Sequence, residues 1–204
     1  MKQIVSISTL AIALLILFNG PLAAQFNTEM PANRWDVELT GGVSMATYKL
    51  GGADLNTGGG FEAAFHYRIT PNIGAYAGWG WNKFSADRSF AGDDMDFEET
   101  GYVFGMQYIR PFGNSNFSGY LRLGGLYNHI ELENADGDIT DDTGHGLGWQ
   151  LAGGIEIPVG QQWKIIPGVK FNALSRELNS DEPYGKQQLD LNYITFRTGI
   201  VRSF

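Results

Sequence analysis

The ionisable side chains with the most chemical potential lie along segments in which apolar and polar residues alternate. These candidates are Glu38, Glu62, His66, Arg68, Arg122, Glu156, Lys164, Lys170 and Arg197. Residues two apart in a strand point to the same face, so this set can line one shared surface. Charges that are shielded from water must be paired. The pattern therefore predicts a packed charge network, and a narrow polar path for small solutes is the alternative.

A second group of candidate residues is acidic and lies between the alternating segments. Asp136, Asp138 and Asp142 recur within one short polar stretch, and ligands at every second residue are typical of the start of a calcium loop. The glycine and the distal glutamate of an EF-hand are missing from this stretch. Solvated loop tips are the simpler interpretation, and a divalent-cation site at Asp136, Asp138 and Asp142 is the alternative prediction.

Residues that could form a catalytic set are few, because the chain has only three histidines. His129, Glu131, His145 and Ser175 could lie at one level of a sheet, but they are scattered in the sequence. The segment 42–46 lacks the last glycine of a Gly-x-Ser-x-Gly nucleophile elbow and falls in an alternating segment. We therefore predict no enzyme activity and no cofactor.

Composition narrows the classes of partner. The formal net charge of −8 makes nucleic acid an unsuitable partner, because phosphate binding requires basic surfaces. The chain has no cysteine, so no disulfide can stabilise an exported form of it.

The N-terminal segment 1–24 has the pattern of a signal peptide. Lys2 provides a positive start, residues 4–18 form an apolar run, and Leu22-Ala23-Ala24 offers a cleavage site. The run is shorter than the roughly 20 residues that span a bilayer as a helix. We therefore expect residues 1–24 to be removed, residues 25–33 to form a short periplasmic leader, and residues 34–204 to form the folded domain.

From residue 34 onward the hydrophobic period is two, which is typical of β-strands. Trp35, Val37 and Leu39, for example, alternate with Asp36 and Glu38. The pattern predicts strands at about 34–46, 59–69, 73–85, 96–110, 117–132, 146–158, 163–177 and 188–204. Each is long enough for the roughly 9–11 residues of a tilted membrane strand. Pro167 interrupts the seventh strand, and because proline cannot donate to a ladder it predicts a bulge or a gap there.

The connections between these strands alternate in length. Short connections fall at 70–72, 111–116 and 160–162, and long polar ones at 47–58, 86–95, 133–145 and 178–187. Outer-membrane barrels have short periplasmic turns and long external loops, and only closed barrels and helices satisfy all backbone groups in lipid. We predict an all-β fold, a closed antiparallel eight-stranded transmembrane β-barrel, with both termini on the periplasmic side.

Aromatic residues on the outward face of this barrel predict two interfacial girdles. The girdle near the short turns comprises Trp35, Tyr67, Tyr108, Trp163 and Phe204, and the girdle near the long loops comprises Tyr48, Trp81, Tyr127, Trp149, Phe171 and Tyr193.

The C-terminal strand carries the most specific local pattern. Phe204 ends the chain, and Ile200 and Phe196 alternate before it. With this strand, the layout of residues 34–204 resembles the small eight-stranded outer-membrane barrels of the OmpA, OmpX and OmpW type. In that family the barrel-assembly machinery reads a terminal aromatic residue, so the resemblance implies an assembly signal at Phe204, Ile200 and Phe196. Arg202 departs from the family pattern, which usually has an aromatic residue third from the end.

The resemblance implies an integral outer-membrane protein of a Gram-negative bacterium, with outer-membrane lipid, lipopolysaccharide and the barrel-assembly machinery as partners. We predict a monomeric, non-enzymatic barrel with a structural or surface-interaction role. A narrow pore, or a conduit for small hydrophobic solutes, is the first alternative. A lipid A-modifying enzyme is the second. A soluble lipocalin, also an eight-stranded barrel, would require an apolar interior and a polar exterior.

Overall fold

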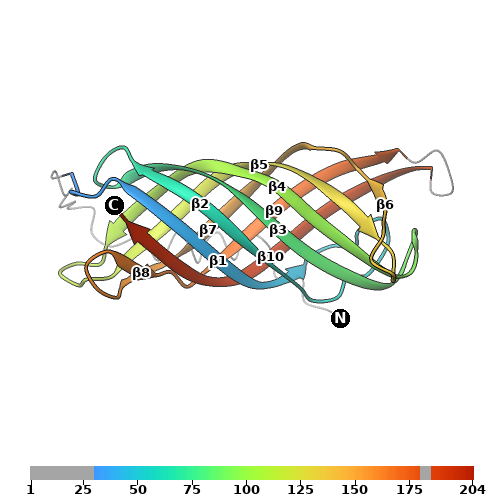
Figure 1. The fold of residues 1–204 in the computed structure, drawn as a ribbon, viewed down its shortest axis with the longest axis horizontal. Coiled ribbons are helices and arrows are strands. Elements are labelled where there is room, and N and C mark those ends of the chain that lie inside the picture. The colour runs from blue at the N-terminus through green and yellow to red at the C-terminus, as the bar shows by residue number, and fades with distance from the viewer. Residues whose placement is uncertain (1–29, 180–184) are drawn as a thin grey trace.

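The computed structural model describes residues 30–179 and 185–204, and strands are the regular secondary structure of these residues (Figure 1). The predicted signal peptide and most of the predicted leader lie outside the described residues. No helix among the described residues is long and apolar enough to cross a membrane.

The sheet contains ten strand segments in the described chain. They are β1 (Trp35–Ala46), β2 (Gly58–Arg68), β3 (Ile73–Ser89), β4 (Gly92–Pro111), β5 (Ser118–Glu133), β6 (Ile139–Asp142), β7 (Gly146–Pro158), β8 (Trp163–Ile165), β9 (Gly168–Asn179) and β10 (Lys186–Ser203). Neighbouring segments pair antiparallel, and β10 pairs with β1 along its length. This last pairing closes the sheet, so the predicted closed antiparallel barrel is confirmed.

The ten segments form eight full strands of the barrel wall, each of which we call a stave. β6 is a short return strand that pairs only with the outer part of β5, while β7 takes the next place in the barrel wall. β8 and β9 are two parts of one stave, because both pair with β7 on one side and β10 on the other. The predicted count of eight strands is therefore confirmed.

The break between β8 and β9 falls at Pro167, as the sequence predicted. The registers on the two sides of the break are continuous, since Ile165 faces Ile200 and Gly168 faces Arg197. The stave therefore has a gap in its ladder rather than a bulge. The Pro167 carbonyl still accepts a hydrogen bond from the Ile155 amide at 3.0 Å.

The predicted long loop at 86–95 is wrong. β3 and β4 continue to Ser89 and Gly92, which face each other across a tight turn. The extension follows from packing, because Ala86 and Met95 on these strand ends are buried inside the barrel. Pairing in the extended strands provides hydrogen-bond partners for the backbone N–H and C=O groups of these two residues. In a loop, the same groups would be unpaired beside an apolar interior.

The two ends of the barrel differ (Figure 1). At the end that we call the short-turn end lie β8, the C-terminus and the connections 69–72, 112–117 and 159–162. At the other end, the long-loop end, lie β6 and the segment 47–57.

The outer wall between these ends is apolar. Large side chains on it are about half exposed or more, including Leu39 at 51%, Phe65 at 66% and Leu123 at 63%. Aromatic pairs mark both edges of this belt, with Trp35 against Tyr67 near the short-turn end and Trp149 against Phe171 nearer the long-loop end. A soluble lipocalin has the opposite distribution, so the belt favours a lipid-covered wall.

The interior is layered along the barrel axis. Near the long-loop end it is apolar, and the segment 47–57 folds into it with Leu50 and Ala53 buried against Phe84 and Leu189. Polar and charged side chains fill the middle. A small apolar cluster of Ile109, Tyr120, Ile166 and Val201 lies near the short-turn end.

The prediction that Tyr193 belongs to an outer girdle is wrong. Only 1% of its surface is exposed, and it packs against Phe84 inside the barrel. The alternation of β10 explains this position, because the outward residues are those in phase with Phe196, Ile200 and Phe204, and Tyr193 is out of phase with them.

Candidate functional site: the lumen network and the outer rim

A bidentate ion pair between Glu38 on β1 and Arg122 on β5 crosses the middle of the lumen. Arg122 donates from Nη1 and Nη2 to the two carboxylate oxygens at 2.7 and 2.5 Å. The side chains are 3% and 0% exposed. His66 Nε2 lies 3.2 Å from the same carboxylate, and Arg197 Nη2 lies 4.0 Å from it. Glu38 is thus the shared anion of three basic groups that come from three other strands.

A second buried carboxylate, Glu62 on β2, lies beside this group. It accepts hydrogen bonds from Lys170 Nζ at 3.0 Å and from Arg197 Nη1 at 3.2 Å. Arg197 therefore links the two carboxylates. Charges buried this deeply require such pairing, because an unpaired ion in a low-dielectric interior costs several kcal/mol.

A third charged layer lies toward the short-turn end. Lys164 pairs with Glu156 at 3.2 Å, and Arg68 lies 3.7 Å from Asp36. The Asp36 carboxylate also accepts a hydrogen bond from Ser203. Below this layer a vestibule of about 250 Å³ opens at the short-turn end.

The structure thus brings all nine sequence-predicted network residues to the inner face. They form two groups, Glu38 with Arg122 and His66 and Glu62 with Lys170 and Arg197, and two separate ion pairs, Lys164 with Glu156 and Arg68 with Asp36. Sequence reasoning missed Asp36, the partner of Arg68. Its strand phase, two residues before Glu38, was the signal that could have found it.

Sequence reasoning also missed a polar layer on the long-loop side of these charges. Glu99 accepts hydrogen bonds from Tyr193 and Asn128, and Ser44 contacts both Asn82 and Thr195. This layer borders a cavity of about 20 Å³, which is space for roughly one water molecule. The buried Glu38–Arg122 pair lies between this cavity and the vestibule.

On the outside of the barrel, near the long-loop end, charges gather around Lys83. Its ammonium contacts Asp96 at 2.9 Å, Glu98 at 3.0 Å and also Glu133. Partial burial alone would lower the pKa of Lys83, but the hydrogen bonds to these carboxylates raise it above its usual value. Burial likewise opposes ionisation of Glu98, but hydrogen bonds from Trp81 and Lys83 lower its pKa.

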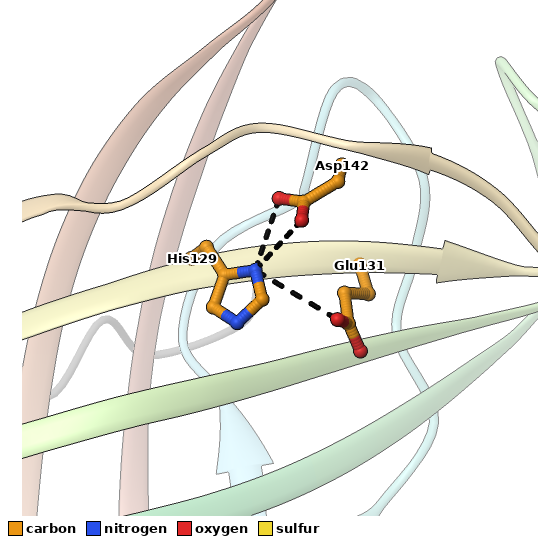
Figure 2. A group of neighbouring side chains, drawn as sticks. All are labelled: His129, Glu131 and Asp142. Atoms are coloured by element: carbon orange, nitrogen blue, oxygen red, sulfur yellow. Dashed lines mark hydrogen bonds and ion pairs between the residues drawn. The ribbon is translucent and has the colours of Figure 1, made fainter.

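A mixed group of metal-ligating side chains also lies on the outside of the barrel near the long-loop end, a region that we call the outer rim. Figure 2 shows His129 and Glu131 of β5 with Asp142 of β6, whose ligand atoms all lie within 4.8 Å of one another. It is the one group of this kind among the described residues. Asp136 and Asp138 are not members of this group, and their backbone amides donate to Asn134 Oδ1 in the turn before β6. A cation site that joins them to Asp142 stays a prediction.

Of the four residues that could form a catalytic set, His129 contacts Glu131 and His145, whereas Ser175 has other partners. Ser175 Oγ donates to Asp190 at 2.6 Å and accepts from Gln188. His129 bonds instead to Asp142. The described residues thus show no serine–histidine pair at this rim, and the absence of enzyme activity stays a prediction.

The predicted assembly residues Phe196, Ile200 and Phe204 all point outward from β10 and are 47–56% exposed. Arg202, which departs from the family pattern, lies with its guanidinium over the rings of Phe204 and Trp163. It therefore contributes a cation–π contact at the place where the family usually has an aromatic ring. Recognition of this strand by assembly machinery stays a prediction.

Comparisons with known proteins agree on the architecture. A family model described as outer membrane protein beta-barrel domain matches residues 10–204. No curated protein matches the chain.

Similar solved structures include Neisserial surface protein A, with 14% identity, a TM-score of 0.61, and coverage of 83% of this chain and 97% of that one. OprG from Pseudomonas aeruginosa has 16% identity, a TM-score of 0.54, and coverage of 84% and 97%. Outer membrane protein W of E. coli has 14% identity, a TM-score of 0.55, and coverage of 85% and 100%. At this identity the likeness establishes the fold alone.

Proposed function

Because the chain belongs to the outer membrane protein beta-barrel domain family, we propose that it is a non-conducting outer-membrane barrel whose function is carried by the surface of its long-loop end. In this proposal the short-turn end and both termini face the periplasm, as the loop lengths favour. The barrel then holds the rim and the long connections at the cell surface.

The observation that carries the proposal is the filling of the barrel interior by buried side chains. The Glu38–Arg122 pair crosses the barrel with both side chains at most 3% exposed. An eight-stranded barrel is just wide enough for its interior side chains to fill it. Above the pair, the segment 47–57 fills the upper interior with Leu50, which is fully buried. A solute would therefore have to displace two independent plugs.

A conduit for small hydrophobic solutes is the second candidate, and one observation favours it. The interior near the long-loop end is lined by Phe84, Phe97, Leu189 and other apolar side chains. Such a lining suits an apolar ligand if the segment 47–57 is withdrawn. In the arrangement described, however, Leu50 and Ala53 of this segment already occupy that space.

Planar-bilayer recording of the purified full chain tests the proposal. We expect no steady conductance, and also none after the segment 49–54 is replaced by a short glycine–serine linker, because the charged layer remains. A stable open channel of porin size in the unaltered chain would refute the proposal. Uptake of an apolar dye into vesicles by the linker variant, together with silence in the bilayer, would favour the hydrophobic conduit.

A further inference from the structure

The rim group of His129, Glu131 and Asp142 is built on paired strands. His129 and Glu131 are two apart on β5, so both point outward. Asp142 belongs to β6, and its Cα pairs with that of Glu131 in the ladder (Figure 2). Three potential ligands thus come from two hydrogen-bonded strands, which fixes their relative positions more firmly than a free loop does.

The distances within the group suit a small metal ion. His129 Nδ1 lies 2.9 Å from Asp142 Oδ2 and 3.8 Å from Glu131 Oε1. Nitrogen and oxygen ligands bind zinc at about 2.0–2.2 Å, which places neighbouring ligands of one ion roughly 3–3.5 Å apart. The observed separations lie close to this range, and all three ligand atoms lie within 4.8 Å of one another.

The ligands are also held by contacts from outside the group. His145 stacks on the His129 ring, with the centroids 4.2 Å apart and the planes at 20°. The Gly144 amide donates to Asp142 Oδ1 at 2.7 Å, and Thr143 Oγ1 accepts from the Ile130 amide at 2.9 Å. Such supporting contacts orient metal ligands in proteins and strengthen binding.

From this geometry we propose that His129, Glu131 and Asp142 form a surface site for a divalent transition-metal ion of the zinc class. One imidazole nitrogen with two carboxylates suits zinc and related ions, whereas calcium and magnesium prefer oxygen ligands alone. Asp142 is the most exposed of the three, with 44% of its side chain accessible. A water molecule therefore has access to the fourth coordination position, as in three-ligand zinc sites.

A bound ion has a structural consequence at this rim. It links β5 to β6, and β6 pairs with β5 through only a few residues and with a register shift. The ion therefore acts as a clamp on the connection 134–145, which leads from the end of β5 to β7. This role does not depend on whether the lumen conducts.

Isothermal titration of Zn²⁺ into the chelator-treated full chain in detergent tests the proposal. We expect one Zn²⁺ per chain. His129→Asn and Asp142→Asn should each weaken Zn²⁺ binding by more than about tenfold. Removing only a supporting partner of a metal ligand already weakens binding by about tenfold or more, and these two changes remove ligands themselves. Asp138→Asn is the matched control, since it removes an acid from the same connection but not from the group, and it should bind as the unaltered chain does.

Heat-modifiable migration on gels shows whether each variant is folded, and the Asp142→Asn variant, altered only on β6, covers a failure of His129→Asn to fold. Unchanged Zn²⁺ binding in a folded His129→Asn or Asp142→Asn variant overturns the proposal. So does full displacement of Zn²⁺ by equimolar Ca²⁺, which would indicate an oxygen-only site. Absence of Zn²⁺ binding in the unaltered chain overturns it as well.

Discussion

The buried pair of Glu38 and Arg122 offers the sharpest test of how the lumen is held together. We consider Glu38→Gln, Arg122→Met and the double variant. The pair has contacts of 2.7 and 2.5 Å and is almost fully buried. Removing one partner of such a pair costs about 3–5 kcal/mol of unfolding free energy, because the remaining charge is left buried and unpaired.

The structure predicts that the two single variants differ. Glu38→Gln removes the carboxylate that Arg122 shares with Arg197 and His66, so two guanidinium groups face each other without it. Its cost should lie near the upper end of that range. Arg122→Met leaves Glu38 with His66 and Arg197, so its cost should lie near the lower end. The double variant should cost about 0–2 kcal/mol, since replacing both partners of a buried pair is often close to neutral.

Urea unfolding of the barrel in lipid vesicles, followed by tryptophan fluorescence, measures these costs. Lys49→Met is the matched control, because Lys49 forms an ion pair with Asp54 at 2.7 Å that is exposed, with side chains 61% and 81% accessible. An exposed pair contributes about 0–1 kcal/mol. The reasoning is refuted if the double variant costs the sum of the two single variants within about 0.5 kcal/mol, because independent sites add in this way.

Three further changes test the wall, the rim and the loops. Val43→Arg, on the half-exposed outer wall, should cost about 2–4 kcal/mol in vesicles, while Val43→Leu stays near zero; equal effects would contradict a lipid-facing position. Lys83→Met should destabilise by at most about 1 kcal/mol at neutral pH, because the Lys83 side chain is about one-third exposed and ion pairs at a protein surface contribute little. The lowered pKa of Glu98 means that the stabilisation from the Lys83–Glu98 contact is present above the usual carboxyl pKa and is lost as the pH falls through the lowered pKa. The urea unfolding curves of the Lys83→Met variant and the unaltered protein should therefore converge in acid. Deleting residues 135–144 should leave heat-modifiable migration intact, since β5 and β7 pair through residues 118–128 and 146–156; loss of folding would make this connection structural.

The period-two pattern was sufficient to predict the barrel and the inward face. Side chains alternate in every strand, so a lipid-covered wall and a closed interior impose opposite chemistry on successive residues. The same rule, counted back from Phe204, would have placed Tyr193 inside, where its hydroxyl reaches Glu99. That error came from grouping aromatic residues by type instead of by phase.

Other features depend on contacts that no local pattern encodes. The partners within the lumen, such as Glu38 and Arg122, are 84 residues apart in the chain, and only barrel closure and strand register decide which charges meet. A tight turn at 90–91 replaces the predicted loop because Ala86 and Met95 pack into the apolar interior of the barrel.

The sequence by itself determined the alternation, the number of staves, the break at Pro167 and the residue types that face inward, because these depend on neighbours in the same strand. Only the tertiary structure decided that Asp142 joins His129 and Glu131 while Asp136 and Asp138 do not. A short return strand can pair in more than one register, and a shift by one residue moves each side chain to the opposite face. The observed pairing of Glu131 with Asp142 therefore selects which acid reaches the histidine.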